Sequence, residues 1–349
     1  MAKSLSYQKL NDLRSISYEI GKRKDLIQAS GGNTSCKIDN LLWVKASGKS
    51  LVKANEEDIF IALDINKVKN ILNCNDNEDV TYPAEIKTHL RASLETALHA
   101  LMPHKYVVHT HALDVIAHTI LFEGQKNLSL LLKDFNWEWV PYKKPGSLLA
   151  REVSKIMQNS SPDILILANH GLVVGGEDIK SVELLQQSVL NKVRINPQSF
   201  NEFNLDKLND YITLLNQNGY YAKLPDCEFV HTLATDDWSL TLANMNPLYP
   251  DHLVFCGFSP INLSSKVSKE MLCKVASTSK YCIIKDIGVI LFKSANQATE
   301  DMLEAQAQVH MRIPKGANIN TLSDVDCEML VNCKSEIYRI NLQKKILKV

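Results

Sequence analysis

Two short apolar runs that each lead into histidine limit how this chain can fold. Residues 106–108 run directly into His109-Thr110-His111, and the apolar run at 164–168 precedes His170 after a single asparagine. Runs of this length and composition predict β-strands. Side chains at positions i and i+2 of a strand lie on the same face, so His109 and His111 can direct two imidazoles to one point. If the two strand ends are neighbours, His170 joins them.

Three converging histidines match a catalytic zinc site, in which three protein ligands leave a fourth position open. The chain has 10 histidines, however, and a His-x-His pair by itself is a weak motif. A histidine at a strand end is more often solvated or hydrogen-bonded than bound to a metal. The metal hypothesis therefore depends on the residues around the three histidines.

The composition is that of an ordinary globular protein. The 349 residues are 45% hydrophobic and 22% charged, and the length suggests two domains or one domain with a large appendage. Lys+Arg and Asp+Glu are both 39, and this balance argues against broad binding of nucleic acid or of a membrane surface. We expect no transmembrane span, no signal peptide and a cytoplasmic protein whose 8 cysteines are reduced.

Short strands mixed with helices along residues 1–197 predict a layered α/β domain. We expect strands over 41–45, 59–63 and 164–168, in addition to the strand that carries His109, and helices over 4–28, 83–101, 112–122, 148–158 and 178–193. Near residue 197 the pattern loosens into a polar stretch. We therefore expect a metal-binding catalytic domain at 1–197 and a C-terminal α/β region at 198–349.

The later region contains one internal sequence similarity. Residues 281–291 resemble residues 164–174, with Asp286 opposite Asn169 and Ile287 opposite His170, and a helix near 295–310 follows. A degenerate partial repeat that has lost its ligand explains this pattern. A recurrent strand-turn-strand-helix unit explains it equally well.

Two other features of the sequence have the chemistry that a catalytic site needs, a pair of small-residue turns and two glutamates. The small-residue turns at 29–35 and 46–50 can bind an anion through backbone N–H groups, although the same residue types dominate ordinary loops. Glu85 and Glu95 are candidates for moving protons, and each can equally be a solvated helix glutamate. Glu95 lies one helical turn before His99, on the same face of the expected helix, which leads toward the histidine strand.

Six ordered motifs over residues 30–175 resemble those of the class II aldolase/adducin family, the zinc-dependent sugar-phosphate aldolases and their relatives. They are Gly32-Asn33-Thr34-Ser35, Val44-Lys45-Ala46-Ser47-Gly48, Ser93-Leu94-Glu95-Thr96 with Leu98-His99, Val108-His109-Thr110-His111, Val140-Pro141-Tyr142 with Pro145-Gly146, and Asn169-His170-Gly171-Leu172. An ordered set is far more specific than one motif. The resemblance weakens after about residue 195, where Pro250-Asp251-His252-Leu253 resembles longer members such as the aldolase part of aldolase/dehydrogenase proteins.

The resemblance implies a three-layer α/β/α fold around a largely antiparallel sheet, with a C-terminal α/β extension. It implies one Zn²⁺ per chain, or another divalent metal, bound by His109, His111 and His170. Glu95 would be the catalytic acid/base, because it follows Ala92-Ser93-Leu94 where the family has a Pro-Ser-Ser stretch. The residues implied in binding the substrate or its phosphate are Gly32, Asn33, Ser47, Gly48 and Ser93. Leu94 replaces one of two phosphate-side serines, which weighs against a phosphorylated substrate, whereas Asn33, Ser47 and Gly48 remain compatible with one.

The function implied is that of a lyase in carbohydrate metabolism, which cleaves or forms a ketose or ketose phosphate through a metal-stabilised enediolate. Epimerases, decarboxylases and dehydratases of this fold share an enolate-type intermediate, and the motifs do not separate them. Adducin-like interaction proteins keep the fold and lose the metal ligands, so the three histidines argue against that alternative. The expected partners are a small sugar substrate and further copies of this chain, in a homo-oligomer that is often a tetramer in the family.

Overall fold

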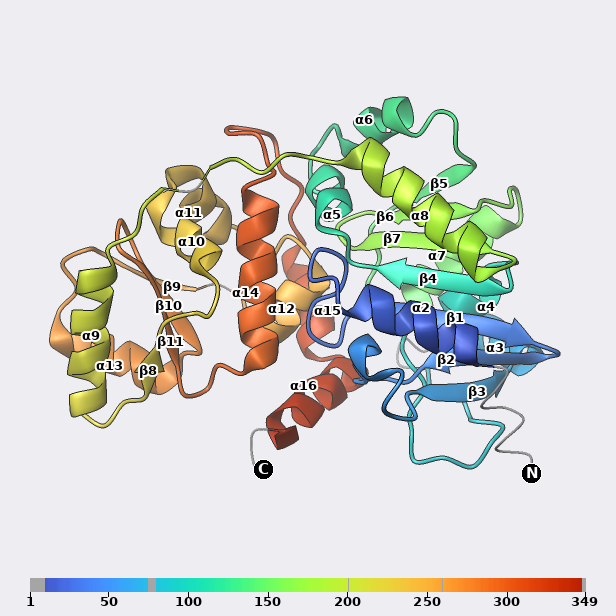
Figure 1. The fold of residues 1–349 in the computed structure, drawn as a ribbon, viewed down its shortest axis with the longest axis horizontal. Coiled ribbons are helices and arrows are strands. Elements are labelled where there is room, and N and C mark those ends of the chain that lie inside the picture. Colours follow the sequence, from blue (N-terminus) through green and yellow to red (C-terminus); the bar gives the residue numbers. More distant parts are fainter. Residues whose placement is uncertain (1–9, 75–79, 200, 259, 347–349) are drawn as a thin grey trace.

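The computed structural model describes residues 10–74, 80–199, 201–258 and 260–346, and the fold is built around two β-sheets (Figure 1). The larger sheet has seven strands in the order β3-β2-β1-β4-β7-β6-β5. Neighbouring strands are antiparallel, except that β5 and β6 are parallel. The strands are β1 (Asn33–Ile38), β2 (Leu41–Lys45), β3 (Phe60–Asp64), β4 (Tyr106–Thr110), β5 (Trp137–Val140), β6 (Ile164–Leu167) and β7 (Gly171–Gly176).

Helices cover both faces of this sheet, because side chains alternate between the faces along each strand. Leu172 and Val174 of β7 pack on one face against α2, α6 and α8, whereas Val173 packs on the other face with α4 and α7. The α/β class and the three layers around a largely antiparallel sheet are therefore confirmed. The helices are α2 (Asn11–Gly21), α3 (Ile65–Cys74), α4 (Thr96–Leu101), α6 (Gly124–Leu131), α7 (Ser147–Met157) and α8 (Ile179–Val193), with the short 3-10 helix η1 (Leu51–Lys53).

The smaller sheet forms the C-terminal α/β extension, with strands in the order β8-β11-β10-β9. Helices α9 and α13 cover one face, and α10 and α14 pack on the other. Its strands are β8 (Ala222–Lys223), β9 (Ile261–Leu263), β10 (Tyr281–Ile284) and β11 (Gly288–Phe292). Its helices are α9 (Leu205–Gln217), η2 (Glu228–His231), α10 (Thr232–Thr235), α11 (Asp237–Ala243), α12 (Pro250–Cys256), α13 (Lys269–Thr278), α14 (Gln297–His310), α15 (Asp324–Val331) and α16 (Lys334–Ile346).

The sequence similarity between residues 164–174 and 281–291 extends to the backbone. The order β6, turn, β7, α8 recurs as β10, turn, β11, α14. The aligned turn residues Asn169 and Asp286 both adopt positive φ angles, 51° and 61°. Ile287, which occupies the place of His170, is buried in an apolar cluster, so the second unit contributes no ligand there.

Helix α5 (Leu113–Thr119) joins the part of the fold around the larger sheet to the smaller sheet through a shared hydrophobic core. Leu113, Ile116 and Ala117 of α5 pack in one cluster with side chains of α14, which lies between the two sheets in Figure 1. The division at residues 197 and 198 stays a prediction. Among the helices of the described ranges, none has both the length and the apolar character needed to cross a bilayer.

Two expected helices are wrong in extent. Of the helix expected over 83–101, only α4 is helical. The preceding segment instead bonds to neighbouring loops and strands: Ser47 N–H donates to Arg91 O at 2.9 Å, and Glu85 N–H donates to Ala62 O at 2.9 Å. The helix expected over 4–28 is confined to α2 among the described residues, and the chain then turns so that Leu26 O accepts from His111 N–H at 2.8 Å. Tertiary hydrogen bonds thus replace helical ones on the way to the site.

We predict that Ile166→Ala, in the middle of β6, lowers the free energy of unfolding by about 2–5 kcal/mol. The side chain of Ile166 is fully buried, and its truncation leaves a cavity in the core. Leu184→Ala, on a side chain that is 60% exposed on α8, should change it by less than about 0.5 kcal/mol. Urea unfolding followed by circular dichroism measures both. Equal losses for the two variants would contradict the packing described here.

Candidate metal centre

Three imidazoles meet at one end of the larger sheet. His109 is in β4, His111 lies just beyond β4, and His170 is in the turn between β6 and β7. The ring centroids of His109 lie 5.0 Å from those of His111 and 4.9 Å from those of His170, and the remaining pair is 5.1 Å apart. All three side chains are buried. The structure thus brings together the histidines singled out from the sequence.

The Asn169-His170-Gly171 turn has a backbone reason for each neighbour of the histidine. Asn169 adopts a φ of 51°, a left-handed conformation that asparagine tolerates better than most residues. Its side-chain amide donates to Leu248 O at 2.9 Å and to Asn320 O at 2.8 Å. A Cβ atom on Gly171 would collide with the carbonyl oxygen of Thr110, so only glycine lets the turn approach the end of β4 this closely.

Glu95 completes the cluster. Glu95 lies at the N-terminal end of α4. His109 is paired with Val173 across β4 and β7, so its side chain points to the face of the sheet that α4 covers. One carboxylate oxygen lies 3.1 Å from His109 Nε2 and 3.4 Å from His170 Nε2. The candidate ligand atoms of Glu95 and the three histidines all lie within 4.8 Å of one another. Glu85, the alternative, pairs instead with Lys67 at 2.7 Å, outside the cluster.

The charges in the cluster are strongly coupled. Burial alone would raise the pKa of Glu95, but the charge and hydrogen bond of His109 outweigh it and hold this pKa well below 4.5. Burial alone would lower the pKa of His109, and the Glu95 carboxylate raises it above 6.5. Burial, together with the neighbouring His109 and His111, lowers the pKa of His170 to about 3. His170 is therefore neutral at physiological pH, which is the form that binds a metal.

The donor set fits a divalent cation. His109 Nδ1 lies 3.1 Å from Leu172 O and can donate its N–H there, so that loss of the Nε2 proton leaves Nε2 as the lone-pair donor for a metal. His111 Nε2 is buried and has no hydrogen-bond partner among the described residues. Buried nitrogen atoms without partners are costly unless something binds them. Three imidazole nitrogens beside one carboxylate are a donor set that suits Zn²⁺.

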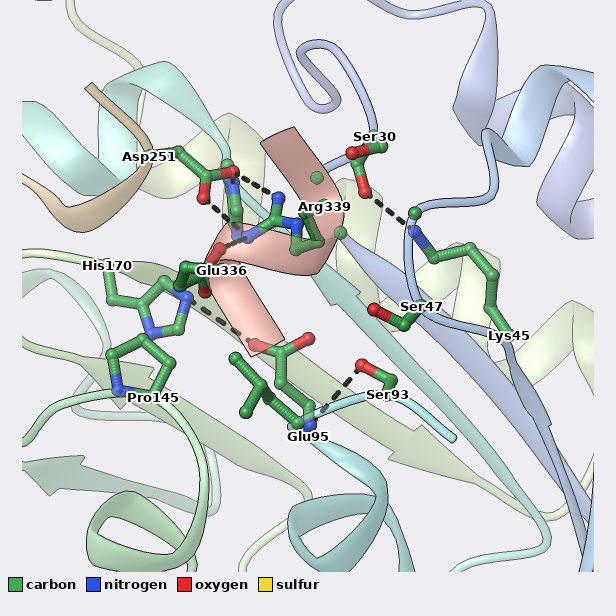
Figure 2. A pocket seen from close by; sticks show the side chains of 15 residues that line it. Ser30, Lys45, Ser47, Ser93, Glu95, Pro145, His170, Asp251, Glu336 and Arg339 are labelled. Carbon is green, nitrogen blue, oxygen red and sulfur yellow. Dashed lines mark hydrogen bonds and ion pairs between the residues drawn. The ribbon is translucent and has the colours of Figure 1, made fainter. Parts of the chain in front are cut away.

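A small cavity adjoins the cluster (Figure 2). Its volume is about 30 Å³, which is room for a few water molecules. Besides Glu95, His111 and His170, its lining includes four of the five predicted substrate-binding residues, Gly32, Ser47, Gly48 and Ser93. The fifth, Asn33, is fully buried in β1 and does not line the cavity.

Four charged residues line the cavity that sequence reasoning did not assign to the site: Lys45, Asp251, Glu336 and Arg339. Lys45 lies in the motif at 44–48 that resembles the family's, and Asp251 lies in the stretch at 250–253 that resembles longer members. Glu336 and Arg339 carry no sequence signal, because they reach the site from α16 by tertiary packing. The Lys45 ammonium donates to Ser30 O at 2.8 Å and to Lys49 O at 2.9 Å, and burial lowers its pKa to about 7.

Comparison with known sequences gives one family match. The family model described as "Class II Aldolase and Adducin N-terminal domain" matches residues 11–185. An L-fuculose phosphate aldolase of Methanococcus maripaludis is 34% identical over 160 residues, which are 44% of this chain and 76% of that protein. An uncharacterised oxidoreductase of Bacillus subtilis is 28% identical over 190 residues, but the match spans only 27% of its length and 48% of this chain.

Solved structures resemble about half of the chain. The N-terminal class II aldolase domain of a Thermoplasma acidophilum protein is 25% identical, with a TM-score of 0.47, and the match covers 53% of this chain and 91% of that one. A sugar-phosphate aldolase from Thermotoga maritima is 18% identical, with a TM-score of 0.42 over 54% of this chain and 95% of that one.

We predict that the purified protein binds about one divalent ion per chain. His109→Ala or His170→Ala should reduce the metal occupancy at least about tenfold, since each removes one of three nitrogen donors. Elemental analysis of protein dialysed against trace Zn²⁺ measures the occupancy. His89→Ala, on an exposed histidine outside the cluster, is the matched control and should keep full occupancy. Equal metal content in all four proteins would refute the assignment.

Proposed function

The chain belongs to the class II aldolase and adducin family, and from this membership we propose that it is a metal-dependent aldehyde-lyase. The reaction would be retro-aldol cleavage of a ketose or ketose phosphate, or the reverse addition. The observation that carries this proposal is the cluster of Glu95 with the buried His109, His111 and His170 beside a cavity. The relatives named as L-fuculose phosphate aldolases support the same reaction class.

The three imidazoles would hold the ion, with Zn²⁺ as the proposed metal. When bound, such an ion polarises a carbonyl and stabilises the negative charge that develops as the adjacent carbon–carbon bond breaks. Glu95 is the carboxylate that can move a proton at that carbon, because it is ionised, largely shielded from solvent and lines the cavity. Gly32, Ser47, Gly48 and Ser93 would bind the remaining substrate oxygens with backbone and hydroxyl donors.

The cavity as described is too small for a sugar. A pocket for even a small organic ligand is typically a few hundred Å³, against about 30 Å³ here. Helix α16 closes one side of the cavity, because Glu336 and Arg339 line it. A Cβ atom on Gly48 would lie 2.5 Å from Leu342 Cδ1, so Leu342 covers a backbone position proposed to bind substrate. We therefore infer that α16 must withdraw from Gly48 before a sugar binds.

We expect Glu95→Gln to lower kcat about 10²- to 10⁴-fold, because the amide cannot exchange the proton, while metal content stays unchanged. The assay incubates the Zn²⁺-loaded enzyme with pentuloses, hexuloses and their 1-phosphates and identifies the aldehyde and ketone products. Glu85→Gln is the matched control, because Glu85 pairs with Lys67 away from the cavity, and it should retain activity. Epimers, CO₂ or dehydrated products in place of an aldehyde would reject the retro-aldol assignment.

Leu342→Ala should lower KM for the substrate found in that assay by about threefold to tenfold and leave kcat unchanged, since it weakens a contact that competes with the substrate. Ile337→Ala changes an apolar side chain of the same helix that is 43% exposed, and it should leave both constants unchanged. Steady-state kinetics measures the two variants. An unchanged KM for Leu342→Ala would show that α16 does not compete with the substrate.

Three sequence-based expectations stay predictions: the cytoplasmic location, the homo-oligomer and the division of the chain at residue 197. Size-exclusion chromatography with light scattering measures the second directly.

A further inference from the structure

The C-terminal part of the chain places a carboxylate against one of the proposed metal ligands. Asp251, in α12, lies with Oδ2 at 3.4 Å from Nδ1 of His111, and both side chains are buried. Asp251 is outside residues 11–185, to which the family model matches. We propose that Asp251 is a positioning residue that orients His111 for metal binding and makes residues 198–349 part of the metal centre. This inference rests on the metal site of the proposed function.

The missing side chain of Gly31 leaves room for the contact between His111 and Asp251, and for the approach of the Gln28 carbonyl oxygen. A Cβ atom on Gly31 would lie 2.8 Å from His111 Nδ1 and 3.0 Å from Asp251 Oδ2. Glycine at position 31 therefore lets the ring and the carboxylate share one side of the loop. The backbone of His111 is fixed independently, because its N–H donates to Leu26 O at 2.8 Å and its carbonyl accepts from the Gln28 amide at 3.3 Å. The remaining freedom is the rotation of the ring, which Asp251 restricts.

Arg339 holds the carboxylate in place. Its guanidinium binds Asp251 with two parallel contacts, Nη1 to Oδ1 at 3.0 Å and Nη2 to Oδ2 at 3.2 Å, and Nη1 also binds Glu336 at 2.8 Å (Figure 2). A buried carboxylate is stable only when it is paired and hydrogen-bonded. A bidentate pair fixes its plane as well as its charge. Helix α16 is thus linked through Arg339 and Asp251 to His111.

Neither of the other two histidines has a carboxylate at its second ring nitrogen, Nδ1, among the described residues. The second ring nitrogen of His109 faces a neutral carbonyl, and that of His170 is buried without a hydrogen bond in the described part of the chain. A carboxylate that accepts from the second ring nitrogen fixes the tautomer and strengthens the imidazole as a ligand. Removing the Asp251 charge should therefore weaken the metal site through His111 alone.

The test measures Co²⁺ affinity of the full-length protein by competition with a chelator, together with the visible absorption of the bound ion. Asp251→Asn keeps the shape and removes the charge, and the expected result is affinity weaker by about 10- to 100-fold with a shifted spectrum. Gly31→Ala keeps Asp251 but forces the pair apart, and it should weaken affinity in the same direction. Glu300→Gln is the matched control: it breaks a pair of 2.6 Å with Lys223 in the same region, and it should leave affinity and spectrum unchanged.

Arg339 acts through Asp251, so Asp251→Asn with Arg339→Gln should bind Co²⁺ no more weakly than Asp251→Asn alone. Wild-type affinity and spectrum in Asp251→Asn would overturn the inference. If that variant fails to fold, Gly31→Ala decides in the same way. If Co²⁺ affinity depends on Asp251 but the protein cleaves no ketose, the proposed lyase activity is refuted and this inference stands. If the protein cleaves a ketose but its Co²⁺ affinity does not depend on Asp251, this inference alone is refuted.

Discussion

The approach of the β6–β7 turn to the end of β4 is the contact on which the rest of the site depends. Hydrogen bonds between β4 and β7 bring the two segments together, and the missing side chain of Gly171 lets the turn close over Thr110. Without this approach, His170 would be separated from His109 and His111. Three distant sequence positions then become a single donor set.

The site concentrates polar groups that a stable core would avoid. Imidazole nitrogens are buried without partners, and Glu95, Asp251, Glu336, Arg339 and Lys45 surround one small cavity. Burial of this kind costs stability unless charges are paired, and Arg339 supplies that pairing for two of the carboxylates. Departures from ordinary core rules are expected where a protein binds or transforms a ligand.

Much of the fold could be predicted from local patterns, and the cluster from the His-x-His spacing together with the family resemblance. The spacing of His109 and His111 on a strand, and the ordered motifs up to His170, depend on nearby residues. The helix expected over 83–101 was wrong because hydrogen bonds to distant loops decide the conformation there. Asp251 and Arg339 could not be assigned, since only the packing of α12 and α16 against the larger sheet brings them to His111.

The central claim is that three imidazoles of one chain bind a single divalent ion. Anomalous diffraction at the zinc absorption edge from crystals grown with Zn²⁺ tests it most directly. We expect one strong peak per chain at about 2.0–2.1 Å from a ring nitrogen of each of His109, His111 and His170. A peak bound elsewhere, or no peak between these rings, would contradict the account.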